Sequence, residues 1–208
     1  AVAVIDRRGE VHRVGDCTRV SRIASVTKLL TAWATLVAAE EGTVSLDDPV
    51  GQPGCTLRHL LAHAGGYSFE GTEPFLPPAT KRVYSNTGYD LVAAHVAESA
   101  GMGFDEYLDE AVCAPLAMSV TGLDGSAARD VWSSVDDLVR FAVELRRPTL
   151  ISRDTWADAR SPQWPALEGV VPGVGRFDPC AWGLGPELKG AKSRHWLGAD
   201  RKSTRLNS

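Results

Sequence analysis

Residues 23–30 read IASVTKLL and place a hydroxyl and an amine three positions apart, at Ser25 and Lys28, ahead of an apolar run. The run that follows is apolar almost all round, which is typical of a helix buried inside a protein. Residues three apart share a helix face, so we expect the Ser25 hydroxyl and the Lys28 amine to meet. The pattern predicts a buried helix from Ser25 to about Glu40, which Gly42 ends in a left-handed cap.

Such a pair has a chemical use. A serine hydroxyl is a weak nucleophile, and a lysine can take its proton only if desolvation or a nearby positive charge lowers the lysine pKa from about 10.4 towards 7. The first turn of a buried helix supplies desolvation and the positive end of the helix dipole, and the backbone N–H of Ser25 is placed to stabilise an oxyanion. The alternative is that Ser25 is an ordinary N-cap and Lys28 a solvated first-turn residue, because Ser-x-x-Lys also occurs by chance.

The composition is that of an ordinary soluble globular protein, with 208 residues of which 44% are hydrophobic and 23% charged. A net charge of −4 gives no electrostatic reason to bind nucleic acid or a membrane surface. No stretch reaches the roughly 18 apolar residues of a transmembrane helix. Four widely spaced cysteines are interpreted as buried thiols, with disulfides left open: Cys17, Cys55, Cys113 and Cys180.

Both ends of the chain are expected to differ from a complete natural protein. The sequence starts at Ala1 without methionine and already in an alternating pattern, so the compartment stays open, with a cytoplasmic location favoured over export. The last residues, Asp200–Ser208, resemble the in-frame translation of a sequencing-library adapter, and a polar disordered tail is the alternative. We therefore expect a partial domain over residues 1–199 and a non-native tail over residues 200–208.

The rest of the chain predicts strands near its two ends and helices between them. Residues 1–14 read as a hairpin around Gly9, and residues 182–189 read as a strand. Helices are expected over residues 56–63, 87–99, 104–112, 134–145 and 154–159. This order fits an α+β fold in which terminal strands pair in one antiparallel sheet, with a helical portion inserted. The sheet is expected to be incomplete at its C-terminal side.

A second informative stretch, KRVYSNTGY at residues 81–89, follows a proline-rich connection and precedes a helix. In an extended segment residues two apart point the same way, so Tyr84 and Asn86 are expected to project together. A tyrosine becomes a usable base when a lysine ammonium stabilises its phenolate, and an asparagine amide can bond both a substrate carbonyl and a lysine. The alternative is that Tyr84 is a packed aromatic and Asn86 an N-cap.

Taken together, IASVTK at 23–28, LRHLLAH at 57–63 and YSNTGY at 84–89 stand in the order and rough spacing of the serine β-lactamase and penicillin-binding protein superfamily. The chain resembles in particular the class C-like branch of β-lactamase-related serine hydrolases, which includes esterases and D-amino-acid peptidases. The resemblance extends to residues 42–49 and 182–185, and so covers most of the chain.

The resemblance implies a β-lactamase/transpeptidase-like fold and acyl transfer through a covalent acyl-serine to water, on an amide or ester carbonyl of a β-lactam, a D-amino-acid peptide or an ester. It implies that Ser25 is the nucleophile and Lys28 its proton-shuttling partner. Tyr84 would be the second general acid or base and Asn86 a substrate-orienting amide, with Ser85 facing away and no cofactor or metal required. A penicillin-recognising sensor that stays acylated and a catalytically inactive structural relative remain as alternatives, and the oligomeric state is open.

One motif of that family is missing from the sequence. The family carries Lys- or His-x-Gly on a later strand that supplies an oxyanion N–H, whereas residues 189–191 lack the spacing and residues 195–198 have one residue too many. Loss of one oxyanion donor costs about 100- to 1,000-fold in rate. We therefore expect this chain to be weakly active or inactive, and its full-length parent to be an enzyme.

Other segments carry weaker signals. His59 and His63 are four apart and could share a metal, but no third ligand is evident, so both are interpreted as packing residues. Nothing in residues 66–78 indicates selectivity for a substrate.

Overall fold

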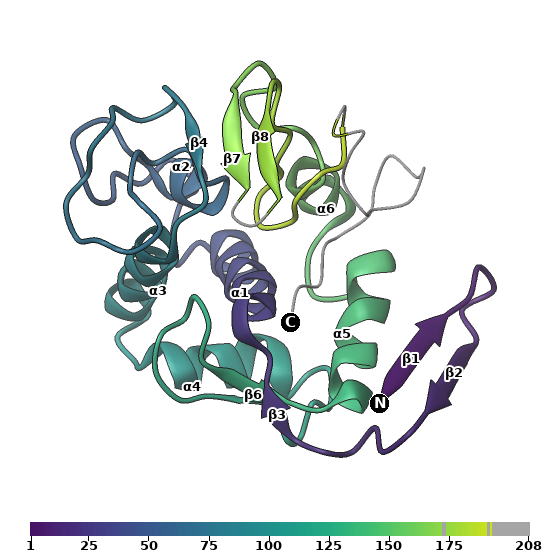
Figure 1. Ribbon diagram of the computed structural model, residues 1–208. Helices are drawn as coiled ribbons and strands as arrows, with labels where there is room; N and C mark the ends of the chain where they lie inside the picture. The colour runs from purple at the N-terminus through teal and green to yellow at the C-terminus, as the bar shows by residue number, and fades with distance from the viewer. Residues whose placement is uncertain (172–173, 191, 193–208) are drawn as a thin grey trace.

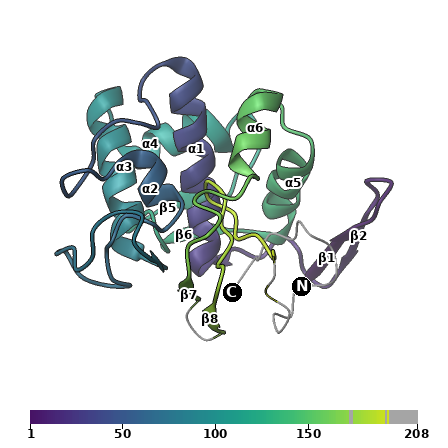
Figure 2. The ribbon, with the colours of Figure 1, turned by 90° about the horizontal axis from the view of Figure 1, so that it is seen from above.

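Helix α1 (Thr27–Glu41) lies at the centre of the computed structural model, which describes residues 1–171, 174–190 and 192 (Figure 1). In both views α1 lies between two groups of helices (Figures 1 and 2). One group holds α2 (Leu57–Leu61), α3 (Asn86–Ala100) and α4 (Phe104–Leu108), and the other holds α5 (Val135–Arg146) and α6 (Arg153–Ala159). Every residue of α1 as far as Ala38 is buried, which confirms the predicted buried helix.

The beginning of this helix differs from the prediction. Ala24–Val26 form a 3-10 turn (η1), so the α-helix begins at Thr27 and not at Ser25. The chain arrives from the short strand β3 (Ser21–Arg22) and passes through Ala24, whose φ of +46° is left-handed. A left-handed residue does not belong to a right-handed α-helix, so the α-helix cannot include Ala24.

The buried hydroxyls of α1 explain how a nearly apolar helix is fixed in one orientation. Thr27 Oγ1 accepts a hydrogen bond from the Val131 N–H at 3.1 Å, and Thr31 Oγ1 donates one to the Ala127 carbonyl at 2.6 Å. Buried polar groups are costly unless they are paired, so these bonds favour one packing of α1 against the segment from Ala127 to Val131.

Three small sheets accompany the helices, which confirms the α+β class. Strands β1 (Val2–Ile5) and β2 (Val11–Val14) form the predicted antiparallel hairpin. A second sheet has the order β3-β6-β5, with β5 at Gly122–Leu123 and β6 at Val131–Ser133. In the third sheet, β4 (Arg82–Val83) runs parallel to β7 (Gly169–Val171), which pairs antiparallel with β8 (Gly175–Phe177).

The predicted pairing of terminal strands in one sheet does not occur among the described residues. Among the described strands, β1 and β2 pair only with each other, and their hairpin lies at the rim of the molecule (Figure 1). Its residues Val2, Val4 and Val14 are exposed. The later strand β7 pairs with β4 instead, and β8 pairs with β7. Strand order depends on contacts between distant segments, which the alternation of single strands does not specify.

Helix ends follow local capping chemistry. Gly42 ends α1 with a φ of +78°, as predicted, and the Ser134 side chain accepts from the Asp137 N–H at the start of α5. The segment predicted as one helix over residues 104–112 is α4 followed by a π turn, η2 (Asp109–Cys113).

Residues 182–189 form a tight reversal and not the predicted strand. A single bridge joins Trp182 and Glu187 around the turn. Gly185 has a φ of +103°, and a Cβ there would lie 2.6 Å from the Cβ of Ala32 on α1. The turn therefore packs directly against the central helix, and a regular strand would not allow that approach.

The four cysteines are free and buried, as interpreted. Within residues 1–171, 174–190 and 192, no helix is long and apolar enough to cross a membrane.

Candidate active site

The amine of Lys28 lies in a closely packed polar cluster inside the protein. Its Nζ donates to Asn86 Oδ1 at 2.5 Å and to the Ala128 carbonyl at 2.9 Å, and the Lys28 side chain is buried. The same nitrogen lies 4.6 Å from the centre of the Tyr84 ring. Burial lowers the pKa of Lys28 to about 7, because the ammonium loses its hydration. A lysine in this state can accept a proton near neutral pH.

Nearby charges adjust this value in both directions. Asp90 and Glu70 raise the pKa of Lys28, whereas the Arg129 guanidinium lowers it, and each effect is smaller than that of burial. No ion pair of Lys28 with a carboxylate occurs among the described residues. The amine is therefore held by neutral oxygens, which bind it without requiring its charge.

Ser25 lies in the 3-10 turn, one helical turn before Lys28, and is half-buried. It is not an N-cap, because Ile23 holds that position and no side chain caps the turn. No hydrogen bond joins the Ser25 and Lys28 side chains in the described part of the chain, because the amine is directed to Asn86 and Ala128. The left-handed Ala24 immediately before Ser25 is a strained conformation for a residue with a side chain.

The second stretch places its polar side chains as the alternation predicts. Ser85 is extended (φ −133°, ψ 131°), and Tyr84 and Asn86 on either side of it both contact Lys28. The Ser85 side chain is turned away and caps α3 by accepting from the Gly88 N–H at 3.0 Å. The N-cap is thus Ser85 and not Asn86, which removes the structural alternative for Asn86.

His63 packs against the segment that carries Tyr84 and Asn86. Its Nδ1 accepts from the Ser85 N–H at 3.1 Å, and its ring lies 4.4 Å from the Tyr84 ring and edge-on to Trp182 at 4.9 Å. Burial and the positive charges of Lys28 and Arg82 keep the pKa of His63 well below its usual value, so the ring is neutral and Nε2 carries the proton.

The two histidines singled out in the sequence make hydrogen bonds to backbone N–H groups and ring contacts. His59 Nδ1 accepts from the Thr56 N–H at 3.2 Å and its ring stacks on Trp164, while His63 Nδ1 is used as described above. Both are packing residues, as interpreted. Ligand atoms of Asp6, Glu10 and His12 do lie within 4.8 Å of one another, but on the β1–β2 hairpin and not at α1.

Sequence reasoning missed the residues that surround Asn86. Its Nδ2 donates to Glu70 Oε1 at 2.7 Å, and Arg129 pairs with the same carboxylate oxygen. The Phe69 ring stacks on Tyr84 at 6.0 Å. Two of these residues lie within the 66–78 segment, in which no selectivity was expected, and no local pattern marks them.

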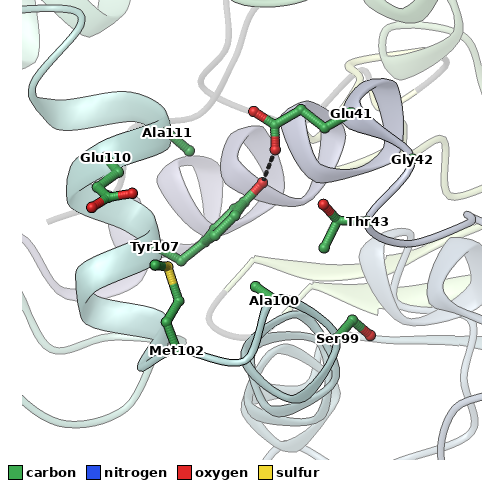
Figure 3. Close-up of a pocket in the computed structure, with 9 residues that line it drawn as sticks. All are labelled: Glu41, Gly42, Thr43, Ser99, Ala100, Met102, Tyr107, Glu110 and Ala111. Carbon is green, nitrogen blue, oxygen red and sulfur yellow. Dashed lines mark hydrogen bonds between the residues drawn. The ribbon is translucent and has the colours of Figure 1, made fainter.

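A separate cavity of about 530 Å³ lies at the far end of α1 (Figure 3). Its walls include Glu41, Ser99 and Glu110, and Tyr107 donates to Glu41 at 2.8 Å. The helical rise puts Glu41 about 20 Å from Lys28 along α1, so this cavity is not part of the Lys28 cluster.

Comparison with known proteins identifies the family of this chain. Residues 1–200 match the family described as Beta-lactamase. The chain belongs to the Beta-lactamase family. A crystal structure of a β-lactamase from Mycobacterium bovis has a TM-score of 0.88 to this chain and 47% sequence identity, over 91% of this chain and 70% of the other. The D-amino acid amidase from Ochrobactrum anthropi SV3 has a TM-score of 0.72 at 22% identity, over 91% and 70% of the two chains, and shares the fold.

Two curated relatives are less similar in sequence than the M. bovis protein. Penicillin-binding protein 4* of Bacillus subtilis is 27% identical over 132 residues, which is 48% of this chain and 29% of the relative. The D-alanyl-D-alanine-carboxypeptidase/endopeptidase AmpH of Escherichia coli is 27% identical over 169 residues, 58% of this chain and 44% of the relative. The chain thus spans less than half the length of these two relatives.

Proposed function

We propose that this chain is a serine hydrolase, of low activity because it lacks the later Lys- or His-x-Gly motif, in which Ser25 attacks an amide or ester carbonyl and forms an acyl-serine that water then releases. The observation that carries the proposal is Lys28, a buried amine with a pKa of about 7, held by Asn86 and Ala128 one helical turn after Ser25. A neutral amine at this place can take the Ser25 proton during attack and return it to the leaving group.

The other residues receive roles consistent with their positions. The backbone N–H of Ser25 lies in the first turn of the helical segment, where N–H groups lack intrahelical partners and can bind an oxyanion. Asn86 would orient the substrate, and Tyr84, against the Lys28 amine, would act as the second acid or base. The names of the relatives support a substrate among β-lactams and D-amino-acid peptides or amides, and an ester is the further candidate that the sequence resemblance implies.

Intact-protein mass spectrometry tests the proposal. The chain is incubated with a penicillin and, separately, with p-nitrophenyl acetate, and compared with Ser25→Ala. Ser21→Ala, an exposed serine on β3, is the matched control. We expect an adduct and p-nitrophenol release in the wild type and in Ser21→Ala, and neither in Ser25→Ala. An adduct that persists identifies a penicillin-binding sensor instead, and the absence of any Ser25-dependent adduct contradicts both functions.

A further inference from the structure

The loop that carries Glu70 is fastened to the segment after Tyr84. The Asn86 N–H donates to the Phe69 carbonyl at 2.9 Å, and the Thr87 hydroxyl donates to the Gly71 carbonyl at 2.8 Å. Glu70 lies between these two attachments, and its carboxylate accepts from Asn86 Nδ2 at 2.7 Å. The loop therefore holds a carboxylate directly on the amide that contacts Lys28.

This contact decides which way the Asn86 amide faces. An ionised carboxylate only accepts hydrogen bonds, so the amide must present its nitrogen to Glu70 and its oxygen to Lys28. Lys28 does not impose the same choice, because a neutral amine both donates and accepts. Arg129 pairs with the same Glu70 oxygen and holds the carboxylate in place.

The orientation of the amide matters for the chemistry of Lys28. A neutral lysine has two N–H donors and one lone pair, and the two donors are used by the oxygens of Asn86 and Ala128. The lone pair is then left for the proton of Ser25. With the amide reversed, Asn86 Nδ2 would donate to that lone pair, and Lys28 would no longer be free to act as a base.

We propose that Glu70 is a positioning residue that fixes the Asn86 amide with its oxygen toward Lys28 and so keeps the lysine free to accept the Ser25 proton. The inference rests on the proposed function for its consequence in catalysis, but the amide orientation itself is a property of the free protein.

A charge effect must be separated from this orientation effect. Glu70 raises the pKa of Lys28, as does Asp90, whereas Arg129 lowers it, and the nearby His63 is neutral. Glu70→Gln removes the charge, and Arg129, which can only donate, directs the glutamine oxygen to the position where it accepts from Asn86 Nδ2. Glu70→Ala removes both. Measurements well above the pKa of Lys28, where the amine is neutral in every variant, leave only the orientation effect.

The first test measures the rate of Ser25 acylation by p-nitrophenyl acetate under these conditions. We expect Glu70→Ala to slow acylation about tenfold, the effect of one lost hydrogen bond, and Glu70→Gln to restore most of it. Glu73→Gln, an exposed residue of the same connection, is the matched control and should match the wild type. Wild-type rates in Glu70→Ala, or a failure of glutamine to rescue, overturn the proposal.

The second test needs no substrate and stays informative if Ser25 is never acylated. Nitrogen-15 NMR follows the side-chain amide of Asn86, assigned from its loss in Asn86→Asp. We expect the amide protons to shift and exchange faster in Glu70→Ala, and to keep nearly their wild-type behaviour in Glu70→Gln. Unchanged signals in Glu70→Ala overturn the positioning role, whereas changed signals without any Ser25 adduct contradict only the proposed function.

Discussion

Burial disfavours the charged form of Lys28, because the ammonium loses water and its hydrogen bonds go to the uncharged oxygens of Asn86 and Ala128. The resulting pKa of about 7 predicts how the acylation rate changes with pH. We expect the rate of Ser25 acylation by p-nitrophenyl acetate to fall about tenfold per pH unit below this pKa and to level off above it. Lys28→Met should slow the reaction by about 10²- to 10⁴-fold and abolish the pH dependence.

The matched control for this profile is Lys81→Met, since Lys81 pairs with Glu168 at the surface. It should keep the wild-type profile. A wild-type rate that does not change across neutral pH would contradict the role of Lys28 as the base.

The same pKa also predicts how the free energy of unfolding depends on pH, which can be measured without an activity assay. The pKa of Lys28 is about 10.5 in the unfolded chain and about 7 in the folded one, so in this window the unfolded state binds one more proton. Stability therefore rises with pH there, by about 1.4 kcal/mol per pH unit from this residue. Urea denaturation at two pH values inside the window should show a steeper rise for the wild type than for Lys28→Met. Equal slopes would show that Lys28 stays charged in the folded protein.

Residue spacing predicted the main candidates but not their neighbours, for a physical reason. Ser25 and Lys28 are one helical turn apart, and Tyr84 and Asn86 are two apart in an extended segment, so local geometry alone groups each pair. Glu70 reaches Asn86 across 16 positions, through a proline-rich connection without regular structure. Only the folded chain brings such a residue to the amide.

At the scale of elements, the packing of α1 against residues 127–131 positions Lys28, because Ala128 supplies one of its two oxygens. Thr31 anchors that segment by donating to the Ala127 carbonyl. We expect Thr31→Val to lower the free energy of unfolding by about 1–3 kcal/mol, because it leaves a buried carbonyl unpaired. Calorimetry or urea denaturation measures this loss.

Thr35→Val is the matched control for that substitution. Thr35 is equally buried on the same helix, but its hydroxyl donates to the Thr31 carbonyl of α1 itself, a bond that adds little to helix stability. Its loss should cost clearly less than that of Thr31. Equal effects of the two variants would mean that the bond to Ala127 does not fasten the segment.

The ends of helices could be predicted from the sequence where a capping residue marks them. Gly42 and Ser134 mark helix ends by capping, and both predictions are confirmed. Residues 182–189 were predicted as a strand because their apolar composition suits one, and this prediction is wrong. In the structure the Leu184 and Gly185 N–H groups bond carbonyls of α6 and α2, and such contacts with distant helices override the local preference for a strand.

Across the whole molecule, Arg82 joins parts of the chain that no single element connects. Its buried guanidinium donates to the carbonyls of Cys180 and Gln163 at 2.6 Å each and to that of Ala62. Burial lowers its pKa to about 10, so it stays charged at neutral pH. Strand β4, which leads directly to Tyr84, is thereby tied to the end of α2 and to the segments beside β7 and β8.

We expect Arg82→Lys to lower the free energy of unfolding by about 2–4 kcal/mol, because a single ammonium cannot reach three carbonyls that a planar guanidinium spans. Since β4 precedes Tyr84, the rate of Ser25 acylation should fall in the same variant. Urea denaturation and the p-nitrophenyl acetate assay measure the two effects. Arg176→Lys, at an exposed position on β8, is the control and should change neither. If Arg82→Lys were as stable as the control, the three segments would be held together by their apolar contacts, and Arg82 would only fill the space between them.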